Sequence, residues 1–223
     1  MDTKLRLKYG YPLDCNKCDN LNGKPKNISR IDPFHKNGTG LKLLLIGQDP
    51  TIFEEPERVN TVLMLKETKG KNGQLRKWLE KELIGTENFD KIEIYATNSV
   101  KCQFEKPPTL SNEGPLKFLK PKFEFCKFYL INEIENYKPD IVLTLGETAH
   151  KLFSKEIEVM NGKLIGEMKK DFSGNFVKAK IGNVGFYYSP CLHIKTFRVA
   201  ETYGKQVFDF KKGLNEKLKK PVT

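Results

Sequence analysis

The sequence predicts an α/β fold of three layers, α/β/α, built on a short and mainly parallel sheet of four strands. Short apolar runs alternate with helical segments along the chain, which is typical of a parallel sheet with helices on both faces. The chain has 223 residues, of which 38% are hydrophobic, enough for one domain with a real core. We therefore expect residues 1–223 to form a single domain.

Each expected strand is a short apolar run bounded by turn residues. The four runs cover residues 41–46, 92–96, 141–145 and 184–188. Helices are expected over 74–83, where apolar residues share one face, over 123–137, from 147 onward, and from about 203 to 218. Residues 1–40 are polar and predict an irregular arm. Residues 103–121 hold four prolines and predict a long loop, and residues 157–181 predict an irregular excursion or a hairpin.

The charge balance favours a polyanionic partner. Lys and Arg outnumber Asp and Glu by 39 to 28, a formal net charge of +11, and nucleic acid is the simplest such partner. The alternative is a basic but merely solvated surface. The N-terminus has no apolar signal region, and no run approaches the ~20 apolar residues of a membrane span. We expect an intracellular, cytoplasmic monomer, a setting in which thiols stay reduced.

Four of the five cysteines suggest a metal site. Cys15 and Cys18 are two residues apart on a turn, and Cys102 and Cys126 lie far downstream. Because disulfides are rare inside cells, ligation is the better interpretation of this set, and it would clasp the arm to the body of the fold. Thiolate-only coordination suits both zinc and an iron–sulfur cluster. Cys191 is the remaining thiol.

Polar tripeptides follow three of the expected strands, at the edge where parallel sheets bind ligands. They are Gln48-Asp49-Pro50, Thr97-Asn98-Ser99 and Ser189-Pro190-Cys191. A carboxylate such as Asp49 can orient a water or stabilise a cation, or it can simply form an Asx turn. The carboxamide of Asn98 matches the imide edge of a pyrimidine, or it can be an ordinary turn residue.

These segments resemble the uracil-DNA glycosylase superfamily. LLLIGQDP matches its first motif and is closest to the conventional uracil-DNA glycosylases, whereas Ala96–Cys102 (ATNSVKC) and the stretch from Cys126 to Ala149 resemble the iron–sulfur (family 4 type) enzymes. The resemblance covers nearly the whole chain. It implies that Cys15, Cys18, Cys102 and Cys126 hold a [4Fe-4S] cluster, with structural zinc as the alternative.

The resemblance also implies roles for individual residues. Asp49 would be catalytic, while Gln48 and Asn98 would bind the base. The third motif departs from the family, because Ser189 stands where a base-binding His is usual. His193, four residues later, would replace that His, act as a wedge in the base stack, or do neither.

Two further positions depart from the family. Thr51 replaces the Tyr that blocks the methyl group of thymine, and the stretch Val62–Leu65, where the family has a base-stacking Phe, contains no aromatic residue. Met64 would take the stacking position, or it is an ordinary core residue. Lys195, Thr196 and Arg198 after the third motif, and Lys101 together with Lys106, Lys120 and Lys122 near the cysteine loop, would contact phosphates.

The resemblance thus implies a DNA repair hydrolase that cleaves the N-glycosidic bond of uracil, or a related deaminated base, in single- or double-stranded DNA. One alternative is a non-hydrolytic or covalently trapping member that binds damaged or single-stranded DNA. Another is a zinc-clasped nucleic-acid-binding domain without pocket chemistry.

Overall fold

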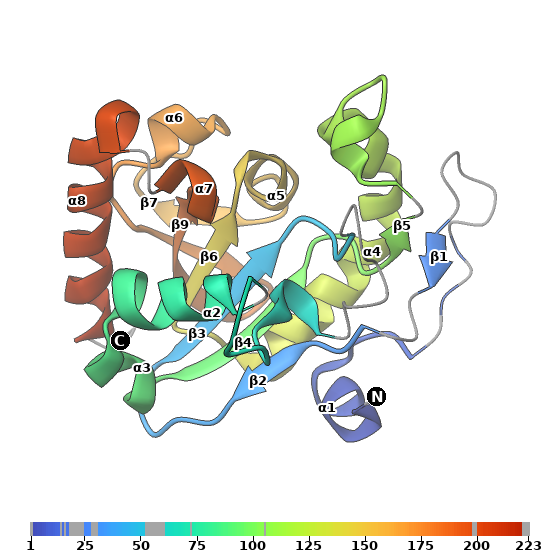
Figure 1. Ribbon diagram of the computed structural model, residues 1–223, viewed down its shortest axis with the longest axis horizontal. Coiled ribbons are helices and arrows are strands. Elements are labelled where there is room, and N and C mark those ends of the chain that lie inside the picture. Colours follow the sequence, from blue (N-terminus) through green and yellow to red (C-terminus); the bar gives the residue numbers. More distant parts are fainter. Residues whose placement is uncertain are drawn as a thin grey trace.

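The computed structural model describes residues 2–13, 15, 17, 25–27, 31–51, 61–71, 73–104, 106–197 and 200–219. Its centre is a seven-stranded sheet in the order β2-β4-β3-β6-β9-β8-β7 (Figure 1). The strands are β2 (Phe34–Lys36), β3 (Lys42–Gly47), β4 (Glu93–Asn98), β6 (Ile141–Leu145), β7 (Glu158–Asn161), β8 (Val177–Ile181) and β9 (Val184–Cys191). A separate antiparallel pair joins β1 (Pro25–Asn27) to β5 (Gln103–Phe104).

The four predicted strands are confirmed as β3, β4, β6 and β9, and they pair in parallel at the centre of the sheet. The prediction of only four strands is wrong, because β2, β8 and β7 extend the sheet with antiparallel pairs. These added strands carry exposed or half-buried residues on at least one face. They therefore lack the continuous apolar runs that marked the buried central strands. The excursion after α5 is indeed a hairpin, formed by β7 and β8.

Helices cover both faces of the sheet, as predicted. Because side chains alternate along a strand, Leu43 and Leu45 join one apolar cluster while Leu44 and Ile46 join the other. The first cluster packs against α3 (Thr86–Lys91), α6 (Met168–Asp171), α7 (Ile194–Phe197), α8 (Ala200–Leu218) and the π-helical segment η3 (Trp78–Ile84) that continues α2 (Gln74–Lys77). The second packs against α1 (Thr3–Tyr9), α4 (Pro115–Tyr137) and α5 (Glu147–Phe153). None of the described helices is long and apolar enough to cross a membrane.

Helix α4 starts earlier than predicted. The proline-rich stretch is a loop only up to a short 3-10 turn, η4 (Pro108–Leu110), and the helix begins at Pro115. Proline is tolerated in the first helical turn because its missing N–H has no partner there. Pro121 lies inside the helix, where the burial of Leu119 and Phe123 against the sheet outweighs one lost hydrogen bond.

The described part of the N-terminal arm is more ordered than predicted. Asp2 caps α1 by accepting a hydrogen bond from Leu5 N, and Gly10 ends the helix in the left-handed conformation. The Arg6 guanidinium is fully buried and donates to Asp32 Oδ1 (2.8 Å) and to the Ile31 carbonyl (2.7 Å). This buried ion pair ties α1 to the chain that leads into β2.

Candidate active site

A cavity of about 410 Å³ opens at the carboxyl ends of β3 and β6. This is the edge at which ligands bind in parallel α/β sheets, and the volume falls within the range of small-ligand sites. The lining comes from segments far apart in sequence: Gly47, Gln48, Asp49, Thr51, Leu63, Leu75, Trp78, Thr109, Leu145, Gly146, Glu147, Thr148, Leu192, His193 and Ile194. Gln48, Asp49, Thr51 and His193 are therefore brought together as the sequence predicted.

The Asp49 carboxylate is held in a fixed position at the cavity wall. Gln48 Nε2 donates to its Oδ1 (2.6 Å), and the Thr51 backbone N–H donates to its Oδ2 (3.1 Å). The second bond is an Asx turn, so the structural and functional interpretations of Asp49 are compatible. Burial raises the pKa of Asp49, and the hydrogen bonds from Thr51 and Gln48 oppose that shift. Thr51 is itself anchored, since its Oγ1 accepts from the Phe104 backbone N–H (2.9 Å).

Asn98, predicted to line the same cleft, ends β4 directly beside the cavity-lining Gly47 of β3 but is not itself among the lining residues. Its side chain is fully buried, and within the described part of the chain neither Oδ1 nor Nδ2 has a hydrogen-bond partner. A Cβ placed on Gly47 would lie 2.2 Å from Asn98 Oδ1 and 2.8 Å from Leu63 Cδ2. Only glycine at position 47 therefore leaves room for the carboxamide. An unsatisfied buried amide costs about 1–3 kcal/mol, so a ligand that pairs with it would recover that energy.

The short 3-10 turn η2 (Val62–Met64) forms another side of the cavity. Leu63 and Met64 both have positive φ angles, 57° and 48°. Such backbone strain in residues other than glycine is costly and often occurs beside ligand sites. Leu63 lines the cavity, whereas Met64, the residue predicted to stack on a base, is half-buried and is not part of the lining.

Strand β9 extends further along the chain than predicted and includes the start of the third motif. Strand β9 continues to Cys191, and the Gly146 backbone N–H donates to the Cys191 carbonyl (2.8 Å). Ser189 is consequently buried inside the strand, where its Oγ bonds the Pro190 carbonyl (3.2 Å), and it is not among the cavity-lining residues. His193 follows the strand, is exposed, and lines the cavity.

Sequence reasoning missed several lining residues. It considered three of the four strand ends, yet Gly146, Glu147 and Thr148 at the end of β6 also line the cavity. The predicted parallel topology could have identified these residues, because it brings the carboxyl ends of all four strands to one edge of the sheet. Trp78 was predicted on an apolar helix face, and it is a buried residue of the cavity wall whose Nε1 has no hydrogen-bond partner among the described residues.

Lys101, predicted to contact DNA, is instead buried inside the fold. Its side chain is fully buried, and its Nζ donates to Thr97 Oγ1 (2.6 Å), to the Asn98 carbonyl (2.7 Å) and to the Glu133 carboxylate. Glu133 also accepts from the hydroxyl groups of Tyr95 (2.7 Å) and Thr97 (2.8 Å). A buried charge persists only when it is paired in this way, so Lys101 anchors the end of β4 to α4.

The other predicted DNA contacts follow His193 in the sequence. Thr196 lies in α7 and, like His193, lines a second hollow of about 410 Å³ next to the first. Lys195 is part of the same helix, but its side chain lies outside the described residues. Arg198 also lies outside them. Phosphate binding by Lys195 and Arg198 stays a prediction.

A second buried polar network lies behind the cavity, on the α5 side of the sheet. His150 Nε2 bonds Asp171 Oδ2 (2.8 Å), and His150 Nδ1 bonds the Tyr188 hydroxyl (2.7 Å), which in turn bonds Thr144 Oγ1 (2.9 Å). Burial lowers the pKa of His150, although the hydrogen bond with Asp171 opposes the shift. Asp171 also accepts from the Gly166 backbone N–H (2.7 Å), so the network fixes the loop before α6.

Three of the predicted cysteine ligands gather on one side of the sheet. Cys102 and Cys126 are buried in the α4 cluster, and Cys15 packs against it half-buried. A hydrogen bond from Cys102 lowers the pKa of the Cys126 thiol to about 7. Cys18 lies outside the described residues, and among the residues that are described no group of three or more His, Cys, Asp or Glu side chains is placed to hold a metal ion.

Cys191 lies apart from these thiols, as predicted. It belongs to the apolar cluster on the opposite face of the sheet, and burial raises its pKa. Its thiol contacts the Leu192 carbonyl (3.6 Å). The four cysteines that the structure describes are therefore divided between the two faces of the sheet.

The structure thus places an anchored carboxylate at the cavity and, at the end of the neighbouring strand, a buried carboxamide without a partner among the described residues. The family comparison is more specific. The model of the uracil DNA glycosylase superfamily matches residues 35–218, so the chain belongs to that superfamily. A comparison with curated proteins found no match.

Proposed function

We propose that this protein is a DNA glycosylase that hydrolyses the N-glycosidic bond of uracil, or of a related deaminated base, in DNA. The superfamily acts on DNA, and the observation that carries the specific proposal is that Asp49 follows β3 while Asn98 ends the adjacent strand β4. The base would leave the stack to reach this cavity. The net charge of +11 favours binding to the DNA backbone.

Asp49 would act on the sugar. Glycosidic cleavage passes through an oxocarbenium-like state, and a carboxylate fixed by two hydrogen bonds can stabilise that cation without rearranging. Its raised pKa also makes it a better base toward a water molecule. Because the cation exists only near the transition state, the carboxylate would contribute to turnover more than to DNA binding.

Asn98 would read the base. Uracil presents a carbonyl and an N–H on its imide edge, and a carboxamide offers the complementary donor and acceptor. The two unpartnered side-chain atoms of Asn98 suit that pairing. Gly47 serves this role by leaving space for the carboxamide. Thr51 lacks the bulk with which other members exclude thymine, so we expect exclusion of thymine to be weak or to come from other residues.

His193 supports a second candidate function for the protein. It lines the same cavity as Asp49 and is the one imidazole of the third motif. Such a group can donate to the departing base, or its nitrogen can bond to the sugar carbon as the glycosidic bond breaks and the base leaves, which would trap the DNA covalently. Trapping would make the protein a non-hydrolytic member, and this alternative rests on the position of His193 alone.

A metal cluster held by Cys15, Cys18, Cys102 and Cys126 is part of the proposal. The all-thiol donor set and the grouping of three of the cysteines on the α4 face support it. A [4Fe-4S] cluster is favoured over zinc by the resemblance of the VKC segment. Such a group would supply a structural clasp between the arm and α4. We propose that the protein works inside the cell, where these thiols stay reduced.

One gel assay tests the function. The protein is incubated with a labelled oligonucleotide containing a single uracil, and the products are separated under denaturing conditions with and without alkali. Alkali-dependent cleavage supports hydrolysis. A slower band that survives denaturation, and that is lost in His193→Ala, supports trapping. An unchanged oligonucleotide overturns both.

A further inference from the structure

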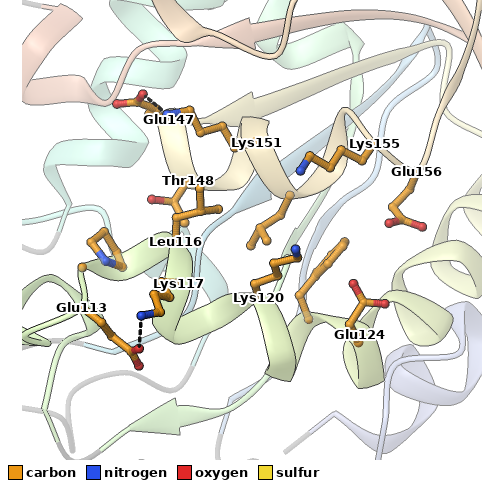
Figure 2. A pocket seen from close by; sticks show the side chains of 14 residues that line it. Glu113, Leu116, Lys117, Lys120, Glu124, Glu147, Thr148, Lys151, Lys155 and Glu156 are labelled. Carbon is orange, nitrogen blue, oxygen red and sulfur yellow. Dashed lines mark ion pairs between the residues drawn. The ribbon is translucent and has the colours of Figure 1, made fainter.

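A hollow that the proposed chemistry does not use lies between α4 and α5. It has a volume of about 540 Å³, and its floor is formed by Leu116, Phe123 and Leu152. Figure 2 shows charged side chains from both helices arranged around this floor. The size is typical of small-ligand sites.

Most of the charges at its rim are neutralised by neighbours. Lys151 pairs with Glu147 (2.6 Å), and Lys117 approaches Glu113 (3.7 Å). The remaining carboxylates of the rim, Glu124 and Glu156, both face Lys127, at 2.6 and 3.8 Å.

Lys120 and Lys155 differ from the other rim lysines. Both are exposed, and neither has an ion pair with any described residue. Figure 2 shows Lys120 of α4 and Lys155, just after α5, extending from opposite walls into the space between the helices. Two unneutralised ammonium groups above an apolar floor fit an anion that also carries apolar groups. A nucleotide unit of a DNA strand has this chemistry.

The hollow adjoins the candidate active site. Glu147 and Thr148 line both cavities, so only the start of α5 separates them. A strand whose nucleotide enters the active site must continue along the surface on either side of it. We propose that the hollow between α4 and α5 is a second DNA subsite, in which Lys120 and Lys155 bind backbone phosphates of the strand flanking the extruded base. This inference rests on the proposed function for its choice of DNA as the occupant.

The test measures binding alone, so that it is independent of catalysis. The Kd of an undamaged single-stranded oligonucleotide is measured by fluorescence anisotropy between 50 and 200 mM salt, for wild type and for Lys120→Gln/Lys155→Gln. The matched control is Lys81→Gln/Lys212→Gln, which removes two exposed lysines from η3 and α8 on the opposite layer. Each phosphate contact to a single strand contributes about 0.7 to the slope of log K against log salt. The subsite variant should therefore lose about 1.4 from the slope, and its sensitivity to this fourfold salt change should fall about sevenfold.

The control variant should keep the wild-type slope. Equal slopes in the subsite variant and the control would overturn the subsite, whatever the gel assay on uracil shows. A second arm uses the mononucleotide dTMP as the probe. If dTMP binds this hollow tightly while the oligonucleotide slope stays unchanged, the site takes free nucleotides and the proposal of a DNA subsite is wrong. Absence of uracil cleavage with the expected slope loss would instead refute the glycosylase and leave the DNA subsite standing.

Discussion

Removing the charge of Lys101 should destabilise the protein strongly, because it leaves the Glu133 carboxylate buried without its cation. Both side chains are fully buried, and Lys101 Nζ also holds Thr97 Oγ1 and the Asn98 carbonyl at the end of β4. Breaking one partner of such a buried pair costs about 3–5 kcal/mol. That loss is large against a typical total stability of about 5–15 kcal/mol.

The measurement is urea unfolding of Lys101→Met beside wild type. With an m-value of about 3 kcal/mol/M, the midpoint should fall by about 1 to 1.7 M while m stays constant. Lys212→Met on the exposed face of α8 is the control, and it should change the stability by less than about 0.5 kcal/mol.

The double variant Lys101→Met/Glu133→Gln separates charge from packing. The carboxamide keeps an oxygen for the hydroxyl groups of Tyr95 and Thr97 but carries no charge, so the double variant should recover at least about 1 kcal/mol relative to Lys101→Met. A single variant that costs less than about 1 kcal/mol, the range of a surface pair, would refute the anchoring role of Lys101. A double variant no more stable than the single one would show that the loss does not come from the unpaired charge.

Three further predictions follow from the same geometry. Gly47→Ala should lower the rate of uracil excision about 10²-fold by displacing the Asn98 carboxamide. The control Gly185→Ala should keep the wild-type rate, because its Cβ would meet nothing closer than 4.0 Å. Single-turnover kinetics measure the rate, and a circular dichroism spectrum shows whether the variant is folded. As the pH falls below about 6.5, the pKa of an unfolded His, the free energy of unfolding should decrease by up to about 1.4 kcal/mol per pH unit, because the buried His150 has a lowered pKa and the unfolded chain binds the proton first. Urea unfolding measured from pH 7 to 5 should give a smaller dependence of stability on pH in His150→Gln than in wild type, and an equal dependence contradicts this. Cys102→Ser should lose bound iron and visible absorbance, whereas Cys191→Ser on the opposite face of the sheet should keep both. An equal metal content in the two variants contradicts the cluster.

The parts of the fold that the sequence predicts well are those in which one physical signal dominates. Strands buried on both faces, such as β3 with its run of leucines, have no polar face and are obvious as apolar runs. The edge strand β7 mixes exposed and half-buried residues, and its pairing with β8 is a long-range property that local composition does not encode. The prediction made helix α4 too short because a proline such as Pro121 normally breaks a helix. In the structure, the burial of the helix against the sheet overrides that preference.

The site was predictable to the extent that it follows from topology. The positions of Asp49 and His193 at one cavity follow from parallel strands ending at one edge. The role of Lys101 could not be predicted, because its neutralising partner Glu133 lies 32 residues away on a helix. Ser189 was misplaced for a similar reason. Proline usually ends a strand, yet β9 runs through Pro190 to Cys191 and carries Ser189 into the sheet.

The most direct test of the central proposal is the release of free uracil by wild type and by Asp49→Asn. Each protein is mixed in excess with a uracil-containing oligonucleotide, and the released base is quantified by chromatography, with Asp90→Asn on the exposed surface of α3 as the control. We predict that wild type and the control release uracil, that Asp49→Asn is slower by at least about 10²-fold, and that all three bind the oligonucleotide equally well. Unchanged release by Asp49→Asn would contradict the assignment of the carboxylate, and no release of uracil by wild type would contradict the glycosylase itself.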